Sequence, residues 1–593
     1  MSKKEINEEK NYSYIEAIEG KNDAITKEEK LVRAIGGVEE KYIKESEPKF
    51  GAKIKVFKIA SCVACLALLI IGTVLISKLI SKDNKEEGMA AKSSQYENLD
   101  ELLEHLGISK DDVPNDNHSD FYLGTKEYFE GEYESGVVAY EGIVYKILDN
   151  KVQIIRENDL NGEIIGEIEG NANNIRRTDN KLIVADIYCY ENDHYKENAD
   201  SIYRVYDLST PDTPKLINTY TLSSNSSTYA IVGDELWFLS WDGACGCGYD
   251  NGYYEAKITT NGETFTFSDE EITILGDPTV IQYTAITKVN IETGKVVDKH
   301  VFYGELEKVY WSEEWMVIDS YSGTKKSALY MYDMDDLTKA TNSLDLYNTA
   351  KDKGECEGYR ISSVLVEDNI IYAVGSSYKA NDRSVEQVTA LIWDTQKNKV
   401  LIENKEEGNE VDINSVTWNE KTAVCCISDG SVHVEFDKDE IKFTGYKEET
   451  SAEKKYYKNY PIDEELYVKT SQKYDSIAIY QYLDDGYVAR MCEVDVDILD
   501  EKKVAEVLVI DENTLAVVVS TQEDTEDATG LAYLTRELQL YKIIREGRIA
   551  LELVKSEVLG TKMRNVYASY KIYEKDGVKY FTSDKTREFV PIN

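Results

Sequence analysis

The residues best suited to chemistry lie in one glycine-rich stretch, WDGACGCGYDNGYYEA, which begins at Trp241. Its two cysteines are separated by a single residue, so they could form a strained local disulfide or bind a soft metal. A zinc-type site needs about four ligands, and no histidine lies nearby to complete the set. We therefore predict no metal here, and two interpretations stay open: a plain surface loop, or a loop that binds a ligand. The candidate binding residues are Trp241, Asp242, Cys245, Cys247, Tyr249 and Asp250.

Catalytic motifs are absent from the sequence. The five histidines are scattered and none stands in a HExxH spacing, and there is neither a GxSxG elbow nor a phosphate-binding P-loop. The acidic run VDVDILD lacks the glycine and the terminal glutamate of a calcium loop. Adjacent Cys425 and Cys426 lie in a predicted buried strand and read as small apolar groups. No catalytic residue and no cofactor is predicted, and the protein is expected not to be an enzyme.

Charge and cysteine content limit the partners. The net charge is −43, and residues 1–58 hold 13 basic and 12 acidic side chains, so the remainder carries about −44. An acidic surface of this strength repels nucleic acid, which excludes it as a partner. Seven cysteines lie beyond residue 77 in a region large enough to bury a core without disulfides, so few or none are expected.

The elements that would position the loop are β-strands. After about residue 134 the apolar period becomes two, and strands rich in Tyr and β-branched residues alternate with polar turns. Seven similar units can be aligned, and their turns are separated by 54, 80, 55, 51, 44 and 48 residues. Such repeats are typical of propeller blades. The predicted turn positions are Asp179, Gly233, Glu313, Asp368, Asn419, Asp463 and Asp511.

The blade number follows from these units. We predict an all-β propeller over 134–593 with seven blades, and eight as the alternative. The 80-residue separation indicates an insertion. Two outlying units, 140–150 and 574–584, are expected to supply further strands, one of which closes the ring by completing the sheet of the other.

The phrase VYDLSTPDTPKLINTYTLSSNSSTYAIVGDELWFLSW, Val205 to Trp241, resembles a bacterial secreted or membrane-anchored β-propeller domain family distantly related to WD-repeat propellers. Residues 206, 207, 209, 211 and 214–216 match the phrase that ends a blade in that family, and Gly233, Asp234 and Leu236 match its next strand. The helix predicted over 98–107, ENLDELLEHL with a glycine stop, is similar to one that the family places before its propeller. The resemblance implies a propeller but lends no defined activity.

An apolar run, Ile59 to Ser77, holds no charged residue and reads as a membrane span. Nineteen residues of helix cover roughly 28 Å, close to the hydrocarbon thickness of a bilayer. Its ten Leu, Ile and Val residues favour insertion by about 3 to 6 kcal/mol in total. Six lysines between residues 41 and 58 precede it and four between 78 and 92 follow it, which places the N-terminus in the cytoplasm and the propeller outside.

The segments around the span are polar. Residues 1–58 are predicted to form a cytoplasmic tail with short amphipathic helices, and 78–97 a linker without regular structure. The stretch AIGGVEEKYIKES, Ala34 to Ser46, resembles juxtamembrane segments of clostridial anti-sigma-type proteins. It lacks the His and Cys ligands of zinc-type anti-sigma domains.

Three functions fit these observations. The preferred one is a single-pass protein of the bacterial cell membrane that presents an extracytoplasmic propeller as a module for binding a protein or wall ligand. The alternatives are a transmembrane regulator whose tail, 1–58, signals to a cytoplasmic partner, and a membrane-tethered propeller hydrolase or lyase.

Overall fold

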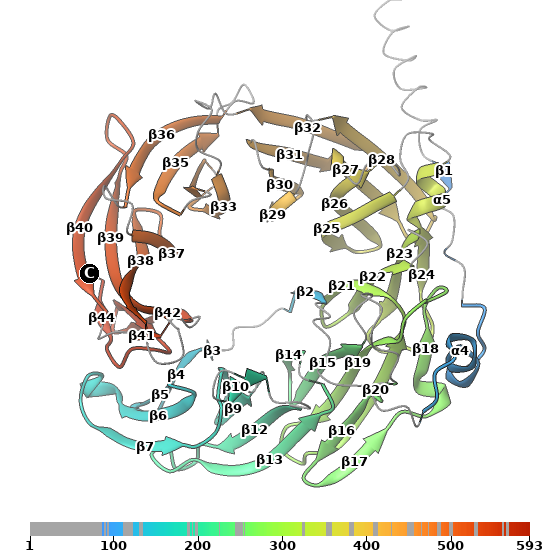
Figure 1. Ribbon diagram of the computed structural model, residues 1–593, viewed down its shortest axis with the longest axis horizontal. Helices are drawn as coiled ribbons and strands as arrows, with labels where there is room; N and C mark the ends of the chain where they lie inside the picture. The colour runs from blue at the N-terminus through green and yellow to red at the C-terminus, as the bar shows by residue number, and fades with distance from the viewer. Residues whose placement is uncertain are drawn as a thin grey trace, which may run out of the picture. The chain divides into compact units, whose positions relative to one another are not determined.

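Short antiparallel strands joined by tight turns make up almost all of the fold (Figure 1), as the apolar period of two predicts. The structure is a computed structural model, and all described residues belong to one compact unit, Lys85–Asn593. It describes residues 86–87, 91, 94–110, 123–129 and 134–592, the last range with gaps at 187–189, 192–193, 196–199, 225, 244–252, 254, 323–325, 352–357, 379–384, 407–412, 428–429, 448–455, 464, 472–473, 483–487, 497–501, 527–531, 560–562 and 565–567.

Nine of the described sheets, here called blades 1 to 9, follow one another along the chain around a central opening (Figure 1). Blade 1 comprises β4 (Val137–Tyr140), β5 (Ile143–Leu148), β6 (Lys151–Arg156) and β7 (Ile164–Ile168). Blade 2 comprises β8 (Asn174–Thr178), β9 (Lys181–Asp186), β12 (Ser201–Asp207) and β13 (Lys215–Leu222). Blade 3 comprises β14 (Ser226–Val232), β15 (Glu235–Gly243), β19 (Gln282–Asn290) and β20 (Val296–Tyr303).

The next three sheets have the same antiparallel order. Blade 4 comprises β21 (Leu306–Trp311), β22 (Trp315–Ser322), β23 (Lys326–Asp333) and β24 (Asn342–Asp345). Blade 5 comprises β25 (Gly358–Glu367), β26 (Ile370–Tyr378), β27 (Val385–Asp394) and β28 (Lys399–Glu406). Blade 6 comprises β29 (Ile413–Asn419), β30 (Thr422–Ile427), β31 (Gly430–Asp437) and β32 (Glu440–Lys447).

The C-terminal sheets complete the series. Blade 7 comprises β33 (Tyr456–Pro461), β34 (Leu466–Ser471), β35 (Ser476–Tyr482) and β36 (Val488–Asp495). Blade 8 comprises β37 (Lys502–Asp511), β38 (Thr514–Glu526), β39 (Ala532–Ile544) and β40 (Ala550–Val558), with β41 (Met563–Arg564) beside β39. Blade 9 comprises three strands, β42 (Tyr570–Lys575), β43 (Val578–Ser583) and β44 (Val590–Pro591).

Extra strands extend four of the blades or stand apart from them. At the inner edges, β2 (Gly124–Glu127) pairs parallel with β21, and β3 (Glu134–Ser135) pairs with β8. At the outer edges, the blades gain β1 (Glu86–Glu87) on β28, β16 (Lys257–Thr260) with β17 (Glu263–Thr266) on β13, and β18 (Ile272–Ile274) on β20. A separate hairpin joins β10 (Tyr190–Glu191) and β11 (His194–Tyr195). The strands β16 to β18 form part of the insertion that the 80-residue separation predicts.

The hydrophobic core is divided among the interfaces between neighbouring blades. Clusters of buried side chains join blades 1 and 2, 2 and 3, 3 and 4, 4 and 5, and 5 and 6. Others join blades 7 and 8, 8 and 9, and 9 and 1, so the series closes into a ring. Blades 6 and 7 meet where β29 and β30 contact β33. Burying the two faces of each blade against its neighbours is the main source of stability for such a ring.

All seven predicted units are hairpins between the first and second strands of blades 2 to 8, and their turns lie where the polar pairs predict them. Asp179, Gly233 and Asp368 hold positive φ angles of 44°, 57° and 49° there, which suits Asp and Gly.

The predicted blade number, seven or eight, is wrong, because the two outlying units do not share a sheet. Residues 140–150 belong to blade 1 and residues 574–584 to blade 9, which brings the number of blades to nine. Each unit is a hairpin with a two-residue turn, at Glu141–Gly142 and Asp576–Gly577, in which both residues have positive φ. Sequence spacing located the hairpins but did not show which of them pair with each other.

Within the described ranges, two short α-helices and two 3₁₀ turns interrupt the strands. Helix α4 (Leu99–Leu106) lies within the segment predicted as helical; the Asn98 side chain caps its first turn and Gly107 ends it with φ of 70°. Its buried face packs on blade 3. Helix α5 (Leu346–Lys351) follows blade 4, and the 3₁₀ turns are η1 (Glu157–Asp159) and η2 (Asp269–Glu271).

The transmembrane helix of the fold prediction has no counterpart among the described residues. Within the described ranges, no helix is long and apolar enough to cross a membrane. The predicted span, Ile59 to Ser77, and the predicted tail, 1–58, lie outside the described residues. The fold-class prediction of seven or eight blades with a membrane helix is therefore corrected, for the described residues, to nine blades with short helices at their margins.

Candidate functional site

The segment before blade 1 forms part of the inner wall of the ring. Strand β2 lies in parallel register with β21, Gly124 beside Lys308 and Glu127 beside Trp311. Buried Leu123 anchors this segment in the core between blades 3 and 4. Alternate side chains of a strand point to opposite faces. Accordingly Glu127 accepts a hydrogen bond from Thr228 of blade 3.

On its other face the same segment reaches blade 5. The Lys126 ammonium lies 3.1 Å from Ser363 Oγ, and the Tyr128 hydroxyl donates to the carbonyl oxygen of Val364. Trp418 Nε1, from blade 6, also donates to Ser363 Oγ, at 2.9 Å. The Ser363 hydroxyl therefore accepts hydrogen bonds from both Lys126 and Trp418 and holds Lys126 in place.

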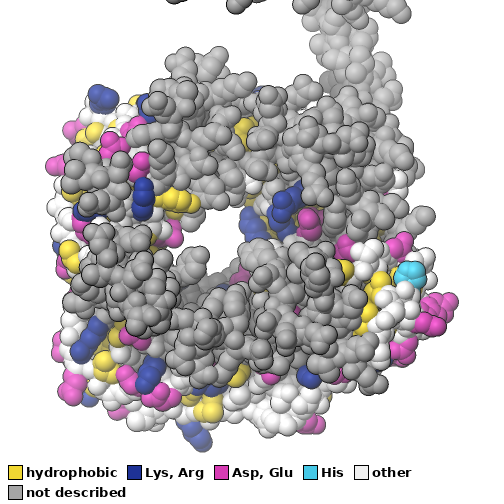
Figure 2. Space-filling model, viewed as in Figure 1, with side chains coloured by type: hydrophobic (Ala, Val, Ile, Leu, Met, Phe, Trp, Pro, Cys, Tyr) yellow, Lys and Arg dark blue, Asp and Glu magenta, His cyan; other side chains and the backbone are white. Residues whose placement is uncertain are grey.

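Three cationic side chains from separate strands gather here: Lys126 of β2, Lys308 of β21 and Arg360 of β25, hereafter the cation cluster. The Lys308 ammonium donates to the carbonyl oxygens of Ile361, at 2.9 Å, and Ser362, at 3.3 Å. The Arg360 side chain is 64% exposed, and its Nε lies 3.9 Å from Glu307 Oε2. Figure 2 shows Lys and Arg side chains on the wall of the central opening, on the side where Figure 1 places β2, β21 and β25.

Burial and mutual repulsion act on the two lysines together. Burial lowers the pKa of Lys126, and the neighbouring charge of Lys308 lowers it further. Burial also lowers the pKa of Lys308, against the opposing effect of Asp319. Among the described residues, no carboxylate lies within 4.0 Å of either ammonium. Two adjacent cations without a close counter-ion are stabilised by an anion placed between them.

Behind the cation cluster lies a carboxyl group with unused hydrogen-bonding capacity. Asp319 of β22 stands opposite Lys308 and is 2% exposed. Burial raises its pKa well above the usual range, and nearby Glu307 raises it further. Within the described part of the chain, Asp319 Oδ2 and the hydroxyl of Tyr310 have no hydrogen-bond partner. A carboxyl kept protonated by burial can donate to an oxygen of a bound group, as an ammonium can.

A bulge in β25 sets the positions of the acceptors for Lys308. The register with β26 shifts between Ile361 and Ser363, opposite Gly375. A Cβ atom at Gly375 would lie 2.1 Å from the carbonyl oxygen of Arg360, which is rigid backbone. Only glycine therefore allows β26 to approach the bulge this closely.

Replacing Gly375 by alanine is expected to destabilise the protein by about 1–3 kcal/mol, because the strand must move to admit the methyl group. Urea unfolding at neutral pH measures the change. Gly166→Ala in β7 is the matched control: its nearest contact is the tip of the Ile154 side chain at 3.3 Å, so its effect should stay within about 0.5 kcal/mol. Equal stability of the two variants would contradict the expectation.

The sequence-predicted site and the cation cluster are different places. Trp241 is buried in the core between blades 3 and 4, and Asp242 is buried on β15 opposite Tyr283 and accepts from the amide of Gly243 at 2.8 Å. Cys245, Cys247, Tyr249 and Asp250 lie outside the described residues, so this site stays a prediction. Cys425, predicted as a small apolar group, is buried within the core between blades 5 and 6.

Sequence reasoning missed the cation cluster because its members come from strands far apart along the chain. In the sequence these members are only three basic residues within an acidic region, and many sets of three such residues occur by chance. In the part of the chain that the structure describes, no group of three or more His, Cys, Asp or Glu side chains could hold a metal ion.

Comparisons with known proteins give remote structural matches and a family match. Among solved structures, Hsv2 of Kluyveromyces marxianus aligns over 64% of this chain and 94% of its own, at 11% identity and a TM-score of 0.31. Hsv2 of Kluyveromyces lactis aligns over 64% and 95%, at 10% identity and a TM-score of 0.30. A functionally unknown protein of Desulfotomaculum acetoxidans aligns over 46% and 76%, at 11% identity and a TM-score of 0.28. No curated protein sequence matches significantly.

The family comparison is the informative one. Residues 130–480 match the beta propeller domain, which is more than half of the chain and agrees with the propeller resemblance noted at Val205 to Trp241. The match does not bear on the resemblance noted at Ala34 to Ser46, which stays a prediction. The chain belongs to the beta propeller domain family.

Proposed function

We propose that this propeller is a binding module that holds a carboxylate-bearing peptide segment against the inner wall of its ring. The observation that carries the proposal is the pair Lys126 and Lys308, half-buried neighbours whose pKa values both fall through burial and which have no carboxylate within 4.0 Å among the described residues. Exposed Arg360 adds a planar guanidinium that suits a carboxylate.

The strands beside the cation cluster favour a peptide as the ligand. Strand β2 is an edge strand of its sheet; β25 is one too, but its Ile361, Ser362 and Val364 carbonyl oxygens already accept from Lys308 and Tyr128. An edge strand presents unpaired backbone N–H and C=O groups, to which an extended peptide can add as a further strand. The cation cluster would then bind a carboxylate of that peptide.

The charge of the whole protein limits how acidic the ligand can be. A net charge of −43 repels polyanions such as nucleic acid at long range, whereas one or two carboxylates lose little on approach. We therefore propose a peptide with a few acidic groups. At the cation cluster Ser363 Oγ accepts hydrogen bonds from Lys126 and Trp418, and we propose binding rather than catalysis as the function of this geometry.

The test exposes the full chain to an array of random pentapeptides and compares the composition of the peptides that bind. The unaltered protein should favour peptides that contain Asp or Glu, and a variant with both Lys126→Gln and Lys308→Gln should lose this preference. Affinity for the best peptide should fall more than about tenfold, since hydrogen bonds to charged groups are each worth about 1.5–3 kcal/mol.

The matched control replaces two exposed lysines away from the ring's inner wall, Lys295→Gln and Lys339→Gln, and so changes the net charge equally. This control should bind acidic peptides as the unaltered protein does. An equal loss in the control would assign the effect to net charge, and no preference for acidic peptides in the unaltered protein would refute the proposal.

The location of the propeller is a separate proposal that rests on the sequence. We propose that it lies outside the cytoplasm, where an extracytoplasmic protein or a wall component would supply the ligand. A membrane-impermeant amine label applied to intact cells should modify its surface lysines. Labelling that occurs only after lysis would refute this location without touching the binding proposal.

A further inference from the structure

The ring closes between blades 9 and 1 without sharing a strand. Blade 1 contains only strands from the start of the propeller and blade 9 only strands from its end. No ladder of backbone hydrogen bonds therefore crosses their interface, hereafter the seam. Instead Phe589 and Tyr573 pack against Val144 and Ile155 of blade 1. The Tyr573 hydroxyl donates to Glu157 at 2.8 Å, and the backbone amide of Asp149 donates to the carbonyl oxygen of Asp584 at 3.1 Å. A molecule bound across the seam would add to the contacts that close the ring.

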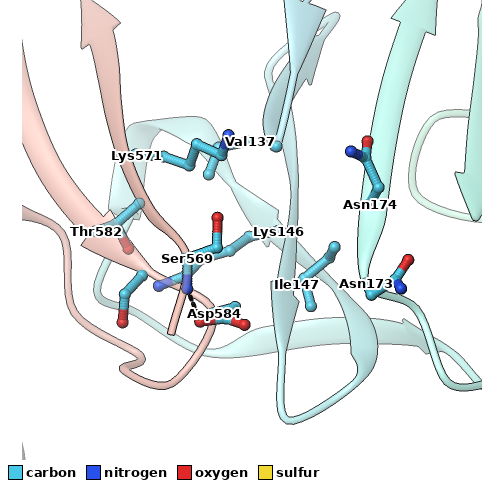
Figure 3. Close-up of a pocket in the computed structure, with 11 residues that line it drawn as sticks. Val137, Lys146, Ile147, Asn173, Asn174, Ser569, Lys571, Thr582 and Asp584 are labelled. Atoms are coloured by element: carbon cyan, nitrogen blue, oxygen red, sulfur yellow. Dashed lines mark hydrogen bonds between the residues drawn. The ribbon is translucent and has the colours of Figure 1, made fainter. Parts of the chain in front are cut away.

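A cavity of about 50 Å³ lies at the seam, lined by residues of blades 1 and 9 and the approach to blade 2 (Figure 3). Each water needs roughly 10–15 Å³ of such space, so the cavity has room for about three to five waters, or for a small oxyanion. Its polar lining comprises two ammonium groups, two amides, three hydroxyls and one carboxyl group.

Two lysines from opposite sides of the seam line the cavity. Lys146 comes from β5 of blade 1 and Lys571 from β42 of blade 9, and Figure 3 shows both beside the cavity. Lys146 is 1% exposed; its ammonium donates to the carbonyl oxygen of Thr586 and lies 4.7 Å from the centre of the Phe589 ring. Among the described residues, no carboxylate lies within 4.0 Å of either ammonium.

Burial lowers the pKa of Lys146 to about 7, against the opposing effects of Asp584 and Glu588. An anion in the cavity would favour its protonated form.

A single carboxyl group, that of Asp584, also lines the cavity. It accepts a hydrogen bond from the amide of Ser569 at 2.8 Å, and burial raises its pKa. A fully ionised oxyanion such as sulfate offers this carboxyl no proton. Hydrogen phosphate retains a hydroxyl that can donate to Asp584 while its other oxygens accept from the lysines and amides.

We propose that the seam cavity is a binding site for a small protonated oxyanion of the hydrogen phosphate class, held between Lys146 and Lys571 and reinforcing the closure of the ring. The site is distinct from the cation cluster and does not depend on the function proposed there. A ligand that binds only the closed ring raises the apparent stability of the folded state with its concentration.

The test is thermal unfolding of the full chain at pH 7 in rising concentrations of sodium phosphate, compared with sodium sulfate at equal ionic strength. Phosphate should raise the unfolding midpoint in a saturable way, and sulfate should give a clearly smaller rise. Lys571→Gln, which removes a half-buried donor, should weaken the apparent affinity for phosphate by at least about tenfold.

Two further variants distinguish this site from general salt effects. Asp584→Asn replaces the acceptor by an amide that can donate, so sulfate should then stabilise as well as phosphate does. Lys575→Gln is the matched control: its ammonium donates to the carbonyl oxygen of Glu157 across the same seam but does not line the cavity, so its midpoint should fall while its phosphate response persists. Equal effects of phosphate and sulfate on the unaltered protein, or a full phosphate response in Lys571→Gln, would overturn the proposal.

Discussion

Replacing Phe589 by alanine is expected to lower the free energy of unfolding by about 3–5 kcal/mol, the range for truncating a buried phenylalanine. Phe589 is 1% exposed and packs across the seam against the core of blade 1. Its ring lies edge-on to Tyr573, with centroids 5.8 Å apart, and under the Lys146 ammonium. Because blades 9 and 1 share no strand, the contacts of the Phe589 side chain provide much of the packing that joins these two blades.

Two measurements separate a seam effect from a general one. Urea unfolding gives the loss of stability, and amide hydrogen exchange should show faster exchange in blades 1 and 9 than in blade 5. Val558→Ala, at a side chain that is 57% exposed on the outer strand of blade 8, should change stability by no more than about 0.5 kcal/mol. Uniformly faster exchange in all blades would show that the ring unfolds as one unit and that the seam is not its weak point.

Acidification is expected to destabilise the propeller through two buried histidines. Burial lowers the pKa of His433 to about 3, and the neighbouring charge of Lys469 acts in the same direction. Burial lowers the pKa of His300 to about 4, against the opposing effects of Asp298, Glu271 and Asp336. A proton on His433 would place a second cation beside Lys469 at the interface of blades 6 and 7.

The sign of the pH dependence follows from these pKa values. An unfolded histidine titrates near pH 6.5, so the unfolded chain binds protons that the folded protein rejects between pH 6.5 and the lowered values. The contribution of the two histidines to the free energy of unfolding is fully present above about pH 6.5 and is lost as the pH falls below this value. At pH 5 each histidine should lower the free energy of unfolding by about 2 kcal/mol, so that the two together lower it by about 4 kcal/mol.

Single variants measure this effect. In His433→Gln, the loss of unfolding free energy between pH 7 and pH 5 should be about 2 kcal/mol smaller than in the unaltered protein. His105→Gln, on the exposed face of α4, should keep the full pH dependence. The same pH dependence in His433→Gln and the unaltered protein would refute the role of His433.

The local features of the fold could be read from the sequence because short-range physics decides them. The seven hairpin turns, such as the one at Asp179, follow from a polar pair between alternating apolar residues. Helix α4 follows from an apolar stripe between a capping residue, Asn98, and a glycine that ends it. Each signal is contained within about a dozen neighbouring residues.

Tertiary structure alone decided the number of blades and the position of the cation cluster. Whether the hairpins at Glu141 and Asp576 share a sheet depends on pairing between chain segments more than 400 residues apart, which no local pattern encodes. Lys126, Lys308 and Arg360 meet only because the segment before blade 1 adds a strand to blade 4 and packs against blade 5. The repeating hairpin and its turns can be predicted from the sequence, because backbone preferences and side-chain alternation act between neighbouring residues. The distant charges meet only in the closed ring, because burial and repulsion depend on what packs around each group.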